Sequence, residues 1–351
     1  MPARGSRGFP HIPTSKTQET RMFRFLYSIS LFCAIAAIFT LPISSTAQPA
    51  YPSRPITLIV PYPPGGGIDP AARIYADALE KALGQTIVIQ NQGGASGQIG
   101  TNHAAHSSPN GYTLLFGSVA PNVILPAAYG NQLPYNEQKD FAPIGLIAQA
   151  DYVLLVSAKL HVNSLKGFLD YAKAQTKPIA YASSGQLSGP HLAGALLSNM
   201  SGIKMLHVPY RGNGPALTAL MSGEVAFAFD SAGGVVSRGK SDKYHALAVT
   251  GDQPFPSDPS LPNLGKLYPG HNVSQWYGLM APAGIPQNVL DRLKAAHEKA
   301  VHSAALQRRM QEIGLNVITD STPQKFQAYV DNEITRWRHI LATQKIGIPK
   351  L

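Results

Sequence analysis

Strand-like and helix-like segments alternate along most of this chain, and this alternation constrains its fold more than any other feature. Apolar runs of strand length, such as Ile56 to Val60, are followed by segments with helical periodicity. The first helical segment is expected to begin with Asp69 as N-cap and Pro70 at the first helical position, and to end at Gly84. Strands that alternate with helices form parallel sheets covered by helices on both faces. The sequence therefore predicts an α/β protein.

Two segments of the sequence are typical of crossings between domains. The strand-like stretch of residues 141–157 has a polar interruption at residues 149–151, and a proline-rich connector spans residues 253–262. Two crossings predict two α/β lobes, with a ligand at the carboxyl ends of the strands. The predicted parts are a leader (1–47), a first lobe (48–147 with 252–351) and a second lobe (148–251).

The N-terminal segment is typical of a secretory signal peptide. A basic stretch that begins at Met22 precedes an apolar run over residues 25–43, and the small residues Ser45, Thr46 and Ala47 follow. The run approaches the length of a membrane anchor, but serine, threonine and proline dilute it. We expect cleavage after Ala47, and a mature protein in the periplasm that is not embedded in the membrane. Residues 1–21 precede an alternative start at Met22.

Removing this leader changes the charge and the cysteine count. Five basic residues and one acidic residue are lost, so the formal charge falls from +10 to +6, and the single cysteine, Cys33, is lost with them. A chain without cysteine excludes a disulfide scaffold and a thiolate zinc site. The remaining positive charge is scattered over C-terminal helical segments with interleaved acidic residues, which argues against nucleic-acid binding.

Two loops between a strand and a helix are the candidate binding elements. The first loop, residues 63–69, contains Gly65, Gly66, Gly67 and Asp69, and its glycines allow a close approach of a ligand to backbone amides. The second loop, residues 183–191, contains hydroxyl groups that can donate to a carboxylate. If the two loops face each other from two lobes, they form a carboxylate clamp.

Other motifs compete with this interpretation. Ser188 and His191 are the residues that a secreted α/β hydrolase would use, although no acid partner is evident near them. Residues 234–241 match the phosphate-binding pattern G-x-x-x-x-G-K-S, but the next strand follows too soon for the required helix. His103 and His106 have helical spacing without a nearby carboxylate, and the segment 275–278 either lines a cleft or fills the core.

Several stretches resemble the solute receptors of tripartite tricarboxylate transporters, the Bug family of periplasmic binding proteins. The resemblance runs in order along nearly the whole mature chain. The stretches include YPSRPITLIVPYPPGGGIDPAAR (51–73), NQGGASGQIGTNHAA (91–105), IAYASSGQLSGPHLAGALL (179–197), HVPYRGNGPALTALMSGEVAFAFDS (207–231) and QWYGLMAPAGIP (275–286). The chain departs from the family at Gln92-Gly93, where a basic-Pro pair is usual, and at Leu187, where a glycine is usual. The usual Asn- and Pro-containing stretch is replaced at residues 231–234.

The resemblance implies a type II-like Venus-flytrap receptor that closes on a small carboxylate and presents it to membrane transporter subunits. It implies a monomer without enzymatic activity, without a cofactor or metal, and without nucleic-acid partners. A ligand-sensing receptor without a transporter is the alternative within this fold, and the identity of the carboxylate stays open. The ligand-binding residues that the resemblance implies are Gly65, Gly66, Gly67, Asp69, Ser183, Ser184, Gly185, Ser188, His191 and Asp230.

Overall fold

The computed structural model divides the chain into two units, Met1–Ala50 and Tyr51–Leu351. It describes Gly8, Pro10, residues 51–65, 67–251, 254–255, 257–344 and 346–348, and Lys350. The expected signal peptide and its cleavage after Ala47 lie outside the described residues. Within the described part of the chain, no helix combines the length and the apolar character needed to cross a membrane.

The first sheet combines three parallel strands with antiparallel neighbours. β1 (Ile56–Val60) lies between β2 (Ile87–Asn91) and β3 (Thr113–Ser118), parallel to both. β9 (Ser274–Pro282) is antiparallel to β3 and to β4 (Phe141–Ser157), on which the short β10 (Asn316–Val317) also pairs. The main helices of this part are α2 (Ile68–Leu83), α3 (Gln98–Ala105), α4 (Leu125–Tyr129), α11 (Gln287–Val301), α12 (Ala304–Glu312) and α13 (Pro323–Thr343).

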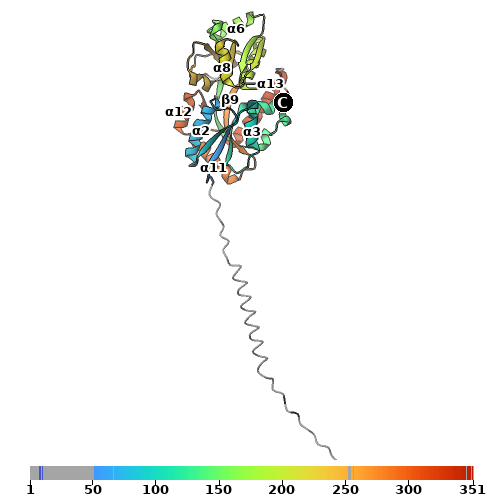
Figure 1. Ribbon diagram of the computed structural model, residues 1–351, viewed down its shortest axis with the longest axis vertical. Helices are drawn as coiled ribbons and strands as arrows, with labels where there is room; N and C mark the ends of the chain where they lie inside the picture. The colour runs from blue at the N-terminus through green and yellow to red at the C-terminus, as the bar shows by residue number, and fades with distance from the viewer. Residues whose placement is uncertain are drawn as a thin grey trace, which may run out of the picture. The chain divides into compact units, whose positions relative to one another are not determined.

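The second sheet repeats this arrangement. β5 (Ile179–Ser183) is parallel to β6 (Met205–Pro209) and to β7 (Phe227–Ser231). β7 and β8 (Tyr244–Val249) are both antiparallel to β4. The helices here are α6 (Leu165–Ala174), α7 (Gly189–Ser201), α8 (Asn213–Ser222) and α9 (Ala232–Arg238), and Figure 1 shows α6 and α8 beside this sheet, apart from α2 and α11. The short helices α5 (Glu137–Asp140) and α10 (Leu264–Leu267) lie in connections.

A single strand, β4, belongs to both sheets. Its residues 141–151 pair with β9, and its residues 152–157 pair with β7 and β8. β4 runs in the same direction as β1 and β3, leaves the first sheet at their carboxyl ends, and enters the second sheet antiparallel to β7. The carboxyl ends of the parallel strands in the two sheets therefore face each other across the middle of β4. The predicted crossing at residues 149–151 is confirmed.

The observed sheets are mixed, whereas the alternation predicted parallel sheets. The parallel pairs are those joined through helices, namely β1 with β2 and β3, and β5 with β6 and β7. The antiparallel pairs all involve β4 or β9. β4 is antiparallel to β7 because it enters the second sheet from the end toward which the parallel strands of that sheet point. β9 runs antiparallel between β3 and β4.

The start of α2 differs from the expectation. The helix begins at Ile68, with Gly67 as N-cap, so Asp69 is not the N-cap and Pro70 is the third helical residue. The Asp69 carboxylate accepts hydrogen bonds from other partners, described below, and is not available to cap. The expected left-handed end at Gly84 is confirmed, with a φ of 72°.

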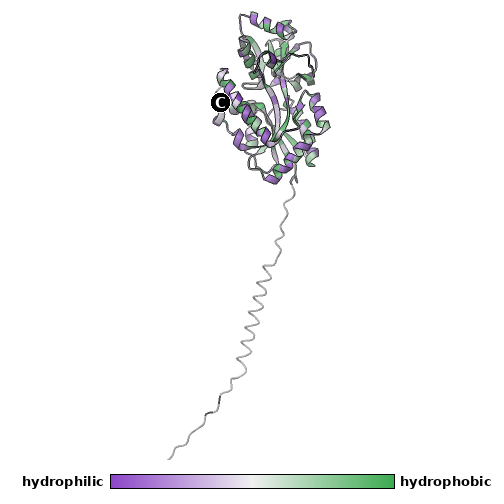
Figure 2. Ribbon diagram, turned by 180° about the vertical axis from the view of Figure 1, so that it is seen from behind, coloured by the Kyte–Doolittle hydropathy of each residue, from purple (hydrophilic) through white to green (hydrophobic). Residues whose placement is uncertain are grey.

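Helix α13 packs its apolar side against the first sheet. Phe326 is fully buried and meets the Trp276 ring edge-on, with ring centroids 5.4 Å apart. Trp337, which lies further along the same helix and is also part of its buried side, is 1% exposed. In Figure 2, hydrophobic and hydrophilic residues alternate along the helices, as expected for helices with one buried face.

We predict that Phe326→Ala lowers the free energy of unfolding by about 3–5 kcal/mol, because it removes a fully buried ring and leaves a cavity beside Trp276. Urea denaturation followed by tryptophan fluorescence measures this loss. Arg338→Ala, at an exposed position of the same helix, is the matched control. A loss below about 1 kcal/mol for Phe326→Ala would contradict the packing described here.

Candidate functional site

Asp69 organises the first loop from inside the protein. The residue is 6% exposed, and its carboxylate accepts hydrogen bonds from Arg73 Nε and Nη2 (3.0 and 3.2 Å), the Gly65 amide (3.1 Å) and Asn91 Nδ2 (3.0 Å). Burial alone would raise the pKa of this carboxyl, but the donors from Arg73, Gly65 and Asn91 hold it below its usual value. The carboxylate is therefore ionised and fully paired, and its observed role is to fix the loop.

Two of the three glycines of the first loop are described, and Gly66 lies outside the described residues. Gly65 is exposed and has a φ of +77°. Gly67 lies directly against the end of β7 in the second sheet. A Cβ atom added to Gly67 would be 2.5 Å from Ser231 Oγ. The first loop thus contacts the residue that follows Asp230.

The second loop is held together by its own hydroxyl groups. Ser188 caps α7 by accepting from the His191 amide (3.4 Å) and donates to the Gly185 carbonyl (2.7 Å). Ser183 Oγ accepts from the Gly185 amide (3.1 Å) and lies 2.6 Å from His207 Nε2. Gly185 has a φ of +133°, which only glycine adopts readily.

Ser184 differs from the other two serines of the second loop. It is half-buried, and no hydrogen bond joins its hydroxyl to any other residue that the structure describes. Its hydroxyl is therefore the one in this loop that has not been used to shape the loop.

His191 is a buried, neutral residue of the second loop. Its Nδ1 accepts a hydrogen bond from the Leu187 amide (3.0 Å), so its proton is on Nε2, and its ring stacks on His207 with centroids 3.9 Å apart. Burial, and then the neighbouring His207, lower the pKa of His191 to about 3, and burial lowers that of His207 to about 4.

Leu187 has a left-handed backbone, with a φ of +55°, and a side chain that is 1% exposed. A non-glycine residue in this conformation is strained, and the burial of the leucine side chain offsets that strain. A glycine, which the family resemblance leads us to expect here, would adopt this backbone without strain. This chain accommodates a leucine instead by burying its side chain.

Ser188 and His191 do not form a catalytic pair. The Ser188 hydroxyl donates to the Gly185 carbonyl, and His191 Nδ1 accepts from the Leu187 amide. The bond between the two residues uses the backbone amide of His191, not its ring. A nucleophile and base require a hydrogen bond between hydroxyl and imidazole, which this arrangement lacks.

Asp230, at the end of β7, is 1% exposed and is paired like Asp69. It accepts hydrogen bonds from Arg238, from Asn213 Nδ2 (2.6 Å) and from the Ser231 amide (2.8 Å). Burial raises the pKa of Asp230 above its usual value, against the effect of Arg238, Ser231 and Asn213. Both candidate acids are therefore occupied by partners within the protein.

The segments around the two loops meet in this structure. Ser96 Oγ, from the segment after β2, donates to the Gln186 carbonyl of the second loop (2.9 Å). The Tyr62 hydroxyl, just before the first loop, lies 3.5 Å from the Ser96 carbonyl and 3.4 Å from Ser118 Oγ. Together with the contact between Gly67 and Ser231, these bonds bring the first loop, the second loop and the end of β7 into one region.

Three tyrosines lie in this region: Tyr62 beside the first loop, Tyr152 in β4 and Tyr277 in β9. Tyr62 and Tyr152 were not identified from the sequence. Burial mainly raises the pKa of Tyr152 and of Tyr277, and the nearby Tyr62 and Asp230 add to both shifts. Tyr152 directly follows the polar interruption of β4, and this position was the sequence signal that could have identified it. Tyr277 belongs to the 275–278 segment, which was expected to line a cleft or fill the core.

The region has few free charges. Asp69 is neutralised by Arg73 and Asp230 by Arg238. Among the described residues, no group of three or more histidine, cysteine, aspartate or glutamate side chains is arranged to hold a metal ion. His103 and His106 bond to Gln92 and to the Asn102 carbonyl. What the region offers a ligand is backbone amides, hydroxyl groups and phenol groups.

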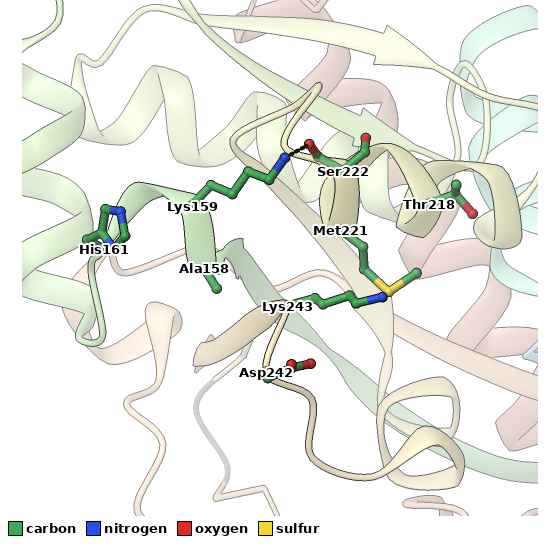
Figure 3. Close-up of a pocket in the computed structure, with 8 residues that line it drawn as sticks. All are labelled: Ala158, Lys159, His161, Thr218, Met221, Ser222, Asp242 and Lys243. Carbon is green, nitrogen blue, oxygen red and sulfur yellow. Dashed lines mark hydrogen bonds between the residues drawn. The ribbon is translucent and has the colours of Figure 1, made fainter.

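A cavity of about 810 Å³ lies elsewhere, at the opposite end of the second sheet. It is lined by Ala158, Lys159, His161, Thr218, Met221, Ser222, Asp242 and Lys243 (Figure 3). Lys159 Nζ donates to the Ser222 carbonyl across it (2.5 Å). Val156 of β4 pairs with Phe227, so this cavity is at the amino end of β7, away from Asp230 and from the end of the sheet where ligands bind in such folds.

The sequence matches the family model of the tripartite tricarboxylate transporter family receptor over residues 71–347. Three solved structures are similar over most of the chain. The periplasmic binding protein BugD is 31% identical, with a TM-score of 0.78, covering 84% of this chain and 99% of BugD. Rpa4515 of R. palustris, solved with adipate, is 30% identical, with a TM-score of 0.78 and coverage of 85% and 99%. MatC from Rhodopseudomonas palustris, solved with malate, is 29% identical, with a TM-score of 0.75 and coverage of 83% and 100%.

We predict that His191 makes the stability of the protein fall at acid pH. The unfolded chain binds a proton at this position below about pH 6.5, whereas the folded protein does not until about pH 3. The stabilisation is therefore complete above pH 6.5 and is lost as the pH falls toward 3. Between pH 7 and pH 5, wild type should lose about 1–2 kcal/mol more than His191→Gln in urea unfolding.

The control for this measurement is His339→Gln, which removes an exposed histidine from α13. If His191→Gln and wild type lose stability in parallel over this pH range, the buried, neutral His191 described here is wrong.

Proposed function

The chain belongs to the tripartite tricarboxylate transporter receptor family, and from this membership we propose that it binds a small carboxylate between its two loops and delivers it to a membrane transporter. Members of this family are solute-binding receptors and not enzymes, so the hydrolase alternative is not retained. The proteins solved with adipate and malate have the same architecture, which supports a carboxylate as the ligand. We place the mature receptor in the periplasm, with a first lobe of residues 48–147 and 252–351 and a second lobe of residues 148–251.

The observation that carries this proposal is the pairing of the acids around the loops. A free aspartate would repel a carboxylate ligand, but Asp69 and Asp230 are each paired with an arginine and with further donors. The Ser184 hydroxyl, which has no partner among the described residues, can donate to an anion. An anion is stabilised by amides at helix starts and by hydroxyl groups without a net positive charge.

The proposed roles of the candidate residues follow from their contacts. Gly65 and Gly67, with Gly66, allow backbone approach, and Ser184 donates its hydroxyl to the ligand. Asp69, Ser183, Gly185, Ser188, His191 and Asp230 act by holding the loops in position. The ligand is thus recognised mainly by groups that carry no charge.

Hinge closure supplies the rest of the mechanism. The two loops belong to different sheets that share only β4 as a continuous strand, while β9 pairs alongside it. A rotation about this connection separates the loops and admits the ligand, and closure brings both sets of donors onto it. The closed form is then the one that a transporter recognises, and we expect a monomer to suffice.

We predict that Ser184→Ala weakens carboxylate binding about tenfold, since it removes a hydrogen bond to a charged group. The stability of the unliganded protein should change by no more than about 0.5 kcal/mol, because this hydroxyl has no partner among the described residues. Thermal shift with mono-, di- and tricarboxylates, each titrated to saturation, gives both quantities.

Ser222→Ala is the matched serine control, since Ser222 lines the cavity of Figure 3. If Ser222→Ala weakens binding and Ser184→Ala does not, the ligand binds in that cavity and the loops are not the site. If no carboxylate raises the melting temperature of wild type, the proposed function is wrong.

We also predict that Gly67→Ala hinders closure. Its Cβ would lie 2.5 Å from Ser231 Oγ, so the first loop could not approach the end of β7 as closely as it does here. The decrease in radius of gyration on ligand addition, measured by small-angle X-ray scattering, should be smaller than in wild type. Adding Ser231→Ala should restore part of it, since this removes the contacted oxygen.

Gly214→Ala is the control for the loss of a glycine, because a Cβ there meets no atom within 4 Å and its φ is not in the left-handed region. An unchanged response of Gly67→Ala to ligand would show that closure does not bring this loop against Ser231.

A further inference from the structure

Gln275, the second residue of β9, has a buried amide group that is only half paired. Its side chain belongs to a residue that is 6% exposed, and its Oε1 accepts a hydrogen bond from the Tyr277 hydroxyl (3.1 Å). Nε2 is buried, and no described residue accepts a hydrogen bond from it. A buried donor without a partner destabilises a protein, so this group is expected to have a function.

The amide lies on the side of β9 that faces the loops. Side chains alternate along a strand, so Gln275 and Tyr277 share one face while Trp276 points to the other, where it packs on Phe326. Tyr277 lies opposite Ser118 of β3, so the two side chains share this face, and Ser118 Oγ donates to the Tyr62 hydroxyl (3.4 Å). The face that carries Gln275 is therefore the one turned toward Tyr62, just before the first loop.

The groups around Gln275 favour an oxygen acceptor as its partner. The Tyr277 phenol donates to its Oε1, and Ser118, opposite Tyr277, donates to the Tyr62 phenol. Burial raises the pKa of both phenols, so both stay protonated. Arg238, the cation that pairs with Asp230, is engaged there. A neutral amide donor among phenols can hold a carboxylate, hydroxyl or carbonyl oxygen, but it offers little to an aliphatic end.

We propose that Gln275 Nε2 donates to a second oxygen-bearing group of the ligand, at the end opposite the carboxylate that the loops bind. This inference rests on the proposed function, since it requires a carboxylate held by the loops. It makes Gln275 a specificity-determining residue. The substrates are then dicarboxylates and carboxylates with a distal hydroxyl or carbonyl, and unsubstituted aliphatic monocarboxylates bind more weakly.

The test uses pairs of ligands that differ only in the second carboxylate, namely adipate with hexanoate and succinate with butyrate, together with malate. Isothermal titration of the mature wild-type protein should give at least about tenfold tighter binding of one dicarboxylate than of its monocarboxylate partner. Gln275→Met, which keeps the side-chain length, should lose about tenfold in affinity for that dicarboxylate and leave the monocarboxylate unchanged.

Gln149→Met is the matched control, because Gln149 is an exposed glutamine on β4, paired with β9 at Trp276. Gln275→Glu is the second variant, which replaces the donor by an acceptor, and should weaken the dicarboxylate at least as much. The melting temperature of each unliganded variant shows whether it folds, and the variant that folds is the one compared.

The outcomes separate the two proposals. If wild type binds none of these acids or any other carboxylate, the proposed function fails, and this inference fails with it. If wild type binds carboxylates but prefers no dicarboxylate, or if Gln275→Met weakens both members of a pair equally, only the role of Gln275 is overturned.

Discussion

The continuity of β4 is the constraint on which the rest of this structure depends. Because one strand of 17 residues supplies hydrogen bonds to both sheets, the parallel strands of the two sheets must point toward each other. Their carboxyl ends, where loops and helix starts concentrate backbone donors, are thereby brought together. The binding region is a consequence of strand direction before any particular side chain is considered.

The second organising feature is that two buried carboxylates are paired with donors from the protein itself. Asp69 lies near the start of α2 and Asp230 lies at the end of β7. Each carboxylate is held by the same three kinds of partner, namely an arginine, a backbone amide and an asparagine. The charges of these carboxylates thus hold the loops in position. Under the proposed function, a ligand then meets loops whose local geometry is fixed before it binds.

Much of the fold followed from the sequence, because strand-length apolar runs and helix caps are local signals. The end of α2 at Gly84 and the crossing in β4 are such cases. The start of α2 was misjudged, since Asp69 is engaged by Arg73 and Asn91, and the second of these partners is 22 residues away. Tyr62 and Tyr152 were missed for the same reason: their proximity arises only when distant strands are assembled. The ligand roles of the loop residues stay predictions.

Leu187 has a consequence for how ligand is exchanged. A loop with a glycine at this point could move on its own over the site, as a lid does. Here the leucine side chain is inserted among buried apolar groups, and His191 fixes its amide. The second loop is thereby anchored to the sheet and helices around it. Under the proposed hinge mechanism, entry and escape of a ligand then require rotation of the two sheets relative to each other, so the residence time of the ligand is set by the hinge and not by the loop.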